Sequence, residues 1–361
     1  MMRLSRMIKI GGFDNVESVM IGGGGASEPV IQTMWKDSLM PVDIPQAILR
    51  INRLKMMGCR LLRFAVPDLE AATVVGELAG SVSMPLVADI HFDYKIALRC
   101  LDFPIAKIRL NPGNIPLRSQ VKKILSKATS REIPIRIGIN AGSLPVDLRK
   151  KVDSRILSVA DALVQTAERE LALFQEFDFQ NVVVSIKASS VSETIKANRL
   201  MAERSDVPLH LGVTEAGPLI AGVVRNTIAL YDLLQDGIGD TIRVSLSDTM
   251  EHEVIAGREI LNAVGRTQQG VTIISCPRCG RYSFDTHAFI EKWLPALYAL
   301  QKPLHIAIMG CTVNGPGEAR HADLGITGAG SKVLLFRQGE VIRTLDAKDA
   351  DKAFAEALGI E

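Results

Sequence analysis

The sequence is poor in aromatic residues, has no long hydrophobic run and carries little excess charge. Only 5% of its 361 residues are Phe, Trp or Tyr, and 42 Lys and Arg offset 40 Asp and Glu to a net charge of +2. This balance argues against a dedicated nucleic-acid-binding protein. No apolar stretch could span a bilayer, and the basic start at Arg3 and Arg6 is not followed by the apolar core of a secretory signal. We therefore expect a cytoplasmic protein without a membrane segment.

Cysteine is also scarce, with five residues in the chain. Cys59 and Cys100 lie in apolar segments and are expected to be buried as small hydrophobic residues. The other three are a CxxC pair, Cys276 and Cys279, and a more distant third, Cys311. This clustering favours metal ligation in a reducing compartment over disulfide formation.

Short β-rich runs alternate with amphipathic helical stretches from about residue 28 to residue 245. Because such alternation is typical of parallel βαβ units, eight runs in about 240 residues predict a (β/α)8 barrel, with an open doubly wound sheet as the alternative. We place the barrel at residues 1–264 and a smaller α/β domain at residues 265–361. The eight runs are Pro29–Met34, Cys59–Val66, Pro85–Asp89, Ala106–Leu110, Ile133–Ile139, Asn181–Ile186, Leu209–Val213 and Asp240–Val244.

The smaller domain begins after a polar linker and contains the cysteines of the CxxC pair. Asp285 or Thr286 is the expected N-cap of its first helix. Its other predicted elements are a strand, a hairpin across Gln338 and Gly339, and a last helix. The predicted ranges are Thr286–Leu300, Leu304–Met309, Val333–Phe336, Val341–Leu345 and Lys348–Leu358.

Polar residues stand where most of the eight runs end. The carboxyl ends of barrel strands form one face, where active sites of this fold lie. Cations gathered there repel one another unless an anion lies among them, and the arginine fork suits phosphate. We therefore predict a small ligand with more than one phosphate. The strand-end residues predicted to bind this ligand are the cations Arg63, Arg109, Arg136, Lys187 and Arg243, with Asp89, His91, Asn111, Asn140 and Ser245.

Glu215 follows the seventh run and is the main acid in these basic surroundings. A carboxyl group at this face could donate or relay a proton. Charge balance for Arg243 or Lys187 is the alternative interpretation.

The three clustered cysteines are followed by a Gly- and Pro-rich loop that ends at Glu318. On spacing alone the cysteines favour zinc, with His287, His305 or His321 as a fourth ligand. Glu318 favours iron instead. Iron–sulfur clusters normally have four thiolates, so three thiolates and a carboxylate would make a reactive centre with one exchangeable ligand.

Several segments, in order along nearly the whole chain, resemble those of the bacterial 4-hydroxy-3-methylbut-2-enyl diphosphate synthases of the methylerythritol phosphate route. Three segments depart from the family pattern: Trp35–Met40, Pro116 and Ser247–Met250. The matching stretches are Val87–Asp93, Lys107–Asn114, Pro134–Leu144, Leu209–Gly217, Gly237–Ser245 and the two cysteine motifs.

The resemblance implies a TIM barrel followed by a small α/β, sulfite-reductase-like domain that holds a [4Fe–4S] cluster. It also implies a homodimer, and flavodoxin or ferredoxin as electron donor. The reaction would be the two-electron reductive ring opening and dehydration of 2-C-methyl-D-erythritol 2,4-cyclodiphosphate to 4-hydroxy-3-methylbut-2-enyl diphosphate. The implied cluster ligands are Cys276, Cys279, Cys311 and Glu318.

The resemblance assigns the substrate to the barrel face, with Glu215 near the reacting carbon atoms. The alternative is a barrel that binds a phosphorylated or pterin-like ligand and carries a structural zinc module. In the resemblance the diphosphate is held by Arg63, Arg109, Arg136, Lys187, Arg243 and Ser245, and the same pocket is lined by Asp89, His91, Asn111 and Asn140.

Overall fold

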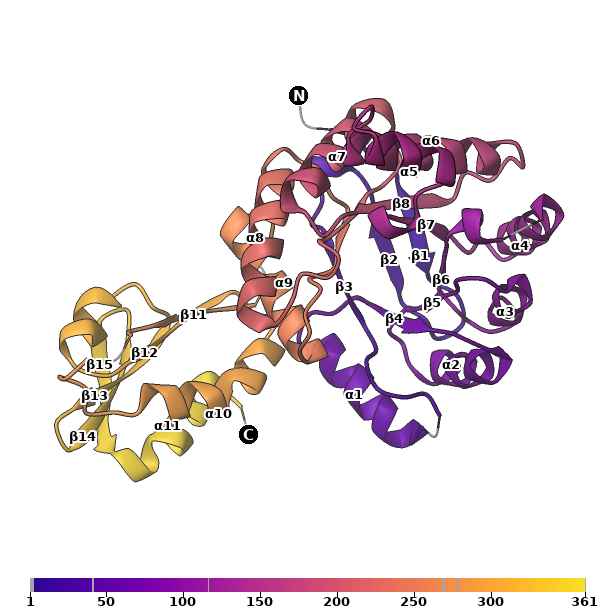
Figure 1. Ribbon diagram of the computed structural model, residues 1–361. Helices are drawn as coiled ribbons and strands as arrows, with labels where there is room; N and C mark the ends of the chain where they lie inside the picture. The colour runs from indigo at the N-terminus through magenta and orange to yellow at the C-terminus, as the bar shows by residue number, and fades with distance from the viewer. Residues whose placement is uncertain (1–2, 41, 116, 268–269, 278, 361) are drawn as a thin grey trace. The chain divides into compact units, whose positions relative to one another are not determined.

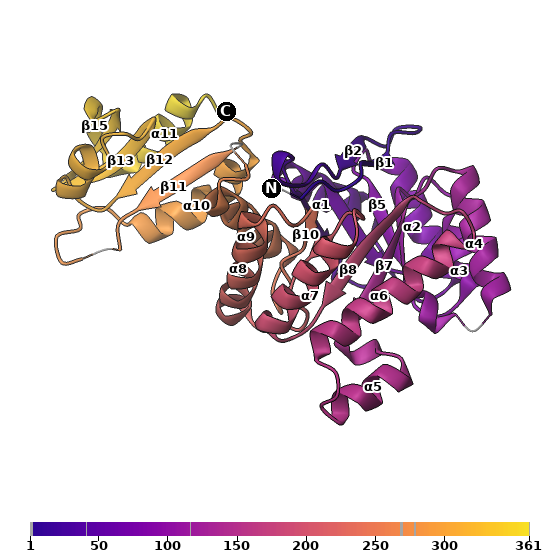
Figure 2. The same cartoon turned by 90° about the horizontal axis from the view of Figure 1, so that it is seen from above.

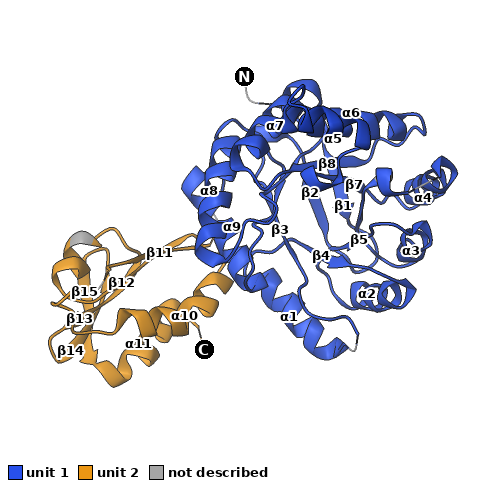
Figure 3. Cartoon of the chain, viewed as in Figure 1, with its two compact units in different colours: residues 1–267 blue, residues 268–361 orange. Residues whose placement is uncertain are grey.

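The computed structural model describes residues 3–40, 42–115, 117–267, 270–277 and 279–360. The chain divides into two compact units, Met1–Thr267 and Gln268–Glu361 (Figure 3). In this described part, no helix has both the length and the apolar character that crossing a membrane requires.

Unit 1 is an eight-stranded parallel barrel surrounded by helices (Figures 1 and 2). Its strands follow the order β8-β7-β6-β5-β4-β3-β10-β9, and a parallel bridge between Val184 and Leu209 joins the two end strands. The closed barrel is therefore confirmed over the open sheet. The strands are β3 (Val30–Met34), β4 (Leu61–Ala65), β5 (Leu86–Asp89), β6 (Lys107–Leu110), β7 (Ile135–Asn140), β8 (Val182–Lys187), β9 (His210–Leu211) and β10 (Thr241–Ile242).

Most helices of unit 1 begin where a polar side chain caps the first turn, whereas α4, α5 and α8 have no side-chain cap. Asp43 accepts a hydrogen bond from the Gln46 backbone N–H, and Asp68, Ser158, Ser190 and Thr249 cap other helices in the same way. The helices are α1 (Ile44–Met56), α2 (Leu69–Ser81), α3 (Tyr94–Cys100), α4 (Arg118–Ser130), α5 (Val146–Asp153), α6 (Val159–Gln175), α7 (Val191–Arg204), α8 (Leu219–Gln235) and α9 (Met250–Val264).

An antiparallel hairpin that the sequence did not predict fills the amino-terminal end of the barrel. It consists of β1 (Ile8–Gly11) and β2 (Ser18–Ile21). Its buried side chains form one apolar cluster with Val30, Leu61 and Val87 from the barrel strands. The opposite, carboxyl-terminal end is left for polar side chains.

Unit 2 is a five-stranded sheet with helices α10 (Thr286–Ala299) and α11 (Ala350–Leu358). Strands β11, β12 and β13 are parallel, and β13, β14 and β15 are antiparallel. Phe289 and Trp293 of α10 pack against Phe354 of α11 at ring-centroid distances of 5.1 and 5.0 Å. The strands are β11 (Val271–Ser275), β12 (Leu304–Met309), β13 (Leu324–Ala329), β14 (Lys332–Arg337) and β15 (Glu340–Asp346).

The predicted hairpin of unit 2 is confirmed, since β14 and β15 meet at Gln338 and Gly339, which have φ values of 47° and 84°. Asp285 is the N-cap of α10, as expected. Strands β11 and β13 were not predicted. The sequence of β13 contains Gly325, which weakens a strand pattern, but a Cβ there would lie 2.0 Å from the Phe336 ring. The glycine therefore makes room for a core aromatic ring.

Candidate active site

A pocket of about 200 Å³ lies at the carboxyl ends of the barrel strands. It brings together every residue that the sequence proposed for the substrate except Asn111. Asn111 is buried, and Glu215 is exposed with a left-handed φ of 52°. Neither of these two lines the pocket. The lining residues are Met34, Arg63, Asp89, His91, Arg109, Arg136, Asn140, Ser185, Lys187, Val213, Thr214, Arg243 and Ser245.

Asp89 is the carboxylate among these lining residues, and two arginines surround it. Its Oδ1 accepts a hydrogen bond from Nη1 of Arg109 at 2.9 Å, and its Oδ2 lies 3.4 Å from Nε of Arg63. Burial disfavours the ionised carboxylate, but the two arginines outweigh burial and lower the pKa of Asp89. Nη1 of Arg109 also lies 2.7 Å from Nε2 of His91, whose pKa burial lowers. Asp89 therefore stays ionised and orients Arg109.

Deeper in the barrel the cations lack carboxylate partners. Lys107 precedes Arg109 by two residues on β6, so both side chains point inward. Nη1 of Arg136 donates to Ser185 Oγ at 2.5 Å, but its Nε and Nη2, like Nζ of Lys107, have no hydrogen-bond partner among the described residues. Burial, and then the charge of Arg136, hold the pKa of both Lys107 and Lys187 well below the usual lysine value. An anion in the pocket would relieve this repulsion.

Glycine is required where β9 ends, beside two of the cations. Gly212 has a φ of 152°, and a Cβ there would lie 2.4 Å from the Arg243 carbonyl oxygen and 3.0 Å from Nζ of Lys187. A larger residue would displace the strand end that carries Arg243 or the lysine side chain. The glycine therefore allows the two cations to share one wall of the pocket.

Glu253 of α9 is a site residue that the sequence analysis missed. It is 1% exposed, and its carboxylate binds Nε of Arg243 at 3.2 Å and Nη2 at 2.9 Å. It also accepts hydrogen bonds from Thr33 Oγ1 at 2.6 Å and from the Leu246 backbone N–H at 2.9 Å. The sequence feature that could have identified Glu253 is its position on the apolar face of a helix, three residues after the buried Met250. A charge in that position requires a partner.

The cysteine motifs of unit 2 meet at one edge of its sheet. Cys276 follows β11 and Cys311 lies two residues beyond β12, and these strands are parallel neighbours. The Gly310 backbone N–H lies 3.1 Å from Cys276 Sγ. Backbone N–H groups of Asn314 and Val313 lower the pKa of the Cys311 thiol. Thiols of this kind, held among backbone donors, suit a thiolate-bound metal group.

The third cysteine of the set, Cys279, is exposed. The side chain of Glu318 lies outside the described residues, as does Arg278 within the CxxC motif. Among the residues that are described, no three His, Cys, Asp or Glu side chains are grouped as metal ligands. By contrast, Cys59 and Cys100 of the barrel are buried as predicted, and burial raises the pKa of each to about 12.

Comparison with known proteins matches both units in chain order. The GcpE TIM-barrel domain matches residues 14–258, and the GcpE protein C-terminal domain matches residues 272–359. A TIM barrel followed by a C-terminal domain of this kind is thus the architecture of a known class. The chain belongs to the GcpE family.

Three relatives are named 4-hydroxy-3-methylbut-2-en-1-yl diphosphate synthase (flavodoxin). The relative from Treponema denticola is 49% identical, over 99% of this chain and 98% of its own. Those from Treponema pallidum and Thermodesulfovibrio yellowstonii are 48% and 42% identical, over 98% and 99% of this chain and 91% and 98% of their own.

Solved structures similar to this chain include a Yersinia pestis dihydropteroate synthase. It is 14% identical with a TM-score of 0.47, over 68% of this chain and 94% of that one. A 3-dehydroquinate dehydratase from Geobacillus kaustophilus is 12% identical with a TM-score of 0.49, over 73% of this chain and 98% of that one.

Proposed function

We infer that this chain catalyses the two-electron reductive ring opening and dehydration of 2-C-methyl-D-erythritol 2,4-cyclodiphosphate to 4-hydroxy-3-methylbut-2-enyl diphosphate, a step of isoprenoid precursor biosynthesis. Family membership over both units supports the reaction. The observation that carries the assignment is the pocket itself, in which Arg63, Arg109, Arg136, Lys187 and Arg243 converge. Such an excess of buried cations suits a cyclic diphosphate.

The barrel, residues 1–264, would bind and orient the substrate. The arginines and Lys187 contact phosphoryl oxygens, and the Ser245 hydroxyl and Asn140 amide add hydrogen bonds. Asp89 fixes Arg109 and Arg63 in place before the anion arrives. This preorganisation supplies positioning, since the fixed dipoles need not reorganise during the reaction. His91 also lines this pocket and is assigned to the same site, whereas Asn111 does not line it and is proposed only to lie beside it.

Residues 265–361 would hold a [4Fe–4S] cluster through Cys276, Cys279, Cys311 and Glu318. When bound, the cluster supplies electrons one at a time and Lewis acidity. In this proposal the chain keeps the thiolates of Cys276 and Cys311 beside backbone N–H donors. Glu318 would act as the exchangeable ligand, and Glu215 would move a proton on the substrate.

The electron donor would be flavodoxin, which the names of the relatives give, with ferredoxin as the alternative. We assign the enzyme to the cytoplasm as a homodimer. Thiolate ligands that must stay reduced are consistent with that compartment.

Anaerobic purification tests the assignment. We expect a brown protein with about four iron and four sulfide per chain, an EPR signal after reduction, and turnover of the cyclic diphosphate with reduced flavodoxin. A colourless protein that contains zinc and does not turn over the cyclic diphosphate would instead favour a structural zinc module on a barrel that binds another phosphorylated or pterin-like ligand.

Two variants test the roles of particular side chains. Arg109→Ala should weaken substrate binding about tenfold or more, the scale of a lost charge-assisted hydrogen bond. Arg204→Ala is its control, because Arg204 forms an exposed ion pair with Glu168, at 3.2 Å, and does not line the pocket. Glu318→Ala should lose turnover, and full turnover with an intact cluster would disprove its role as an exchangeable ligand.

A further inference from the structure

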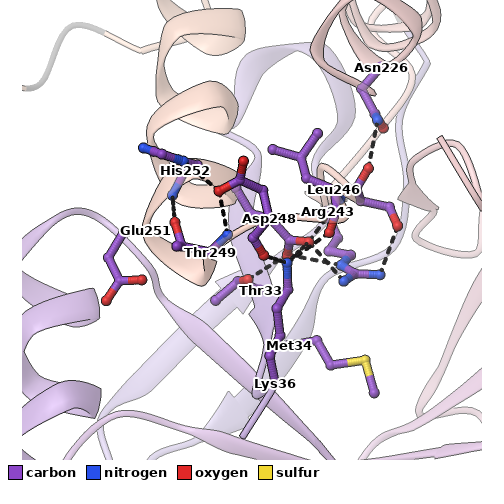
Figure 4. Close-up of polar contacts among 12 residues, drawn as sticks. Thr33, Met34, Lys36, Asn226, Arg243, Leu246, Asp248, Thr249, Glu251 and His252 are labelled. Carbon is purple, nitrogen blue, oxygen red and sulfur yellow. Dashed lines mark hydrogen bonds and ion pairs between the residues drawn. The ribbon is translucent and has the colours of Figure 1, made fainter. Parts of the chain in front are cut away.

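Lys36 lies in the Trp35–Met40 segment, where the sequence departs from the family pattern. The structure shows where its side chain goes (Figure 4). Its Nζ lies 2.9 Å from Oε1 of Glu253 and donates to the Leu246 carbonyl oxygen at 2.8 Å and to the Asp248 carbonyl oxygen. Lys36 therefore contacts both the buried carboxylate behind the pocket and the segment that follows β10.

Glu253 by itself would weaken the anion site. A buried carboxylate that binds Arg243 through two nitrogens, at 3.2 and 2.9 Å, cancels the charge of that arginine. Only Nη1 of Arg243 is then directed elsewhere, to Ser245 Oγ at 3.2 Å. Lys36, Arg243 and Glu253 together hold two cations and one carboxylate, a net charge of +1, and Lys36 also interacts with the Asp248 carboxylate.

The segment held by Lys36 also matters for geometry. Leu246 directly follows Ser245, a lining residue of the pocket, and its backbone N–H donates to Glu253 at 2.9 Å while its carbonyl oxygen accepts from Lys36. The Asn226 amide binds the Ser245 carbonyl oxygen at 3.4 Å from the other side. The Ser245–Leu246 peptide group and the Leu246–Ser247 peptide group that follows it are thus fixed by buried or partly buried polar side chains.

We propose that Lys36 is a positioning residue: it restores a net positive charge to the Arg243–Glu253 pair and fixes the strand end that presents Arg243 and Ser245 to a phosphoryl oxygen. The inference rests on the proposed function, because the anion it serves is the cyclic diphosphate. Lys36 need not touch that ligand, since its hydrogen-bond donors are directed to Glu253, Leu246 and Asp248.

The test is calorimetric titration of the anaerobic holoenzyme with 2-C-methyl-D-erythritol 2,4-cyclodiphosphate, using Lys36→Met and Lys36→Arg. Lys55→Met is the matched control, because Lys55 also has a 26% exposed side chain paired with one glutamate, Glu17 at 2.5 Å. We expect Lys36→Met to raise Kd and KM about tenfold with a smaller change in kcat, and Lys36→Arg to restore most of the affinity. Thermal midpoints of Lys36→Met and Lys55→Met should be similar.

Two results would overturn the inference: a Kd for Lys36→Met equal to that of the wild type, or a loss of affinity that Lys36→Arg does not recover and that parallels a fall in thermal midpoint. Arg109→Ala separates this failure from failure of the proposed function. If Arg109→Ala weakens binding and Lys36→Met does not, only the role of Lys36 is wrong. If neither weakens binding, the diphosphate pocket itself is wrong.

Discussion

Asp89 accepts a hydrogen bond from Nη1 of Arg109 at 2.9 Å, and both residues line the cationic pocket. The pair is buried, with Asp89 3% and Arg109 6% exposed. Removing one partner of a buried ion pair is costly, because the other charge is left uncompensated. The stability of the empty barrel therefore depends on a carboxylate that does not itself attract the substrate.

Asp89→Asn should destabilise the barrel by roughly 1–3 kcal/mol at neutral pH. Because the pKa of Asp89 is lowered in the folded state, the stabilisation is fully present above the ordinary aspartate value of 3.8 and is lost as pH falls through the lower folded value. Urea unfolding at several pH values should show the difference between wild type and variant shrinking below about pH 4. Asp102→Asn, which breaks an exposed pair with Lys127, is the control. A difference that did not change with pH would contradict the assignment.

Gly138→Ala should impair substrate binding while leaving the fold intact. A Cβ at Gly138 would lie 2.3 Å from Nε of Arg109, so the flexible guanidinium must move away from β7. We expect Kd for the cyclic diphosphate to rise about tenfold, the scale of one charge-assisted hydrogen bond. In the control, Gly142→Ala, the new methyl group meets nothing within 4 Å. Equal affinities for the two variants would show that Arg109 does not contact the substrate.

Substrate binding should take up protons. Burial and the neighbouring arginine lower the pKa of Lys187 in the empty pocket, and a bound anion reverses the repulsion and raises that pKa again. Affinity should therefore fall as pH rises through the lowered pKa of Lys187 in the empty pocket. Calorimetry in two buffers of different ionisation enthalpy measures the uptake directly. Lys187→Arg should reduce it, because arginine keeps its proton. Proton release on binding would rule out this linkage.

Glu170→Gln should stabilise the protein at alkaline pH. Burial in α6 raises the pKa of Glu170 from 4.5 to about 7. The folded state thus holds a proton that the unfolded state releases, so stability is greatest below pH 4.5 and is lost as pH rises through 7. The glutamine variant should gain about 1–3 kcal/mol at pH 8 and nothing at pH 4. Glu168→Gln, on the exposed side of the same helix, is the control. A gain of equal size at both pH values would point to a cause other than titration.

The sequence by itself determined the eight strands of the barrel, most helices and the cations at the strand ends, but not β1, β2, β11 or β13. Parallel strands have their carboxyl ends at the same end of the barrel. Polar residues that follow apolar runs must therefore lie together at that end, as Arg63, Arg109 and Lys187 do. N-cap residues such as Asp43 and Asp285 can also be recognised in the sequence, because a cap and the N–H group that it binds lie within one helical turn.

Only the tertiary structure decided which of these side chains meet. Closure depends on the bridge between Val184 and Leu209, and the contact of Glu253 with Arg243 depends on how α9 packs against β3, the neighbour of β10. Lys36 reaches that carboxylate from a part of the chain more than two hundred residues earlier. The periodicity of a sequence does not show which distant residues are in contact. Hydrogen bonds and ion pairs act over a few ångströms, and residues so far apart in the chain come within that distance only in the folded barrel.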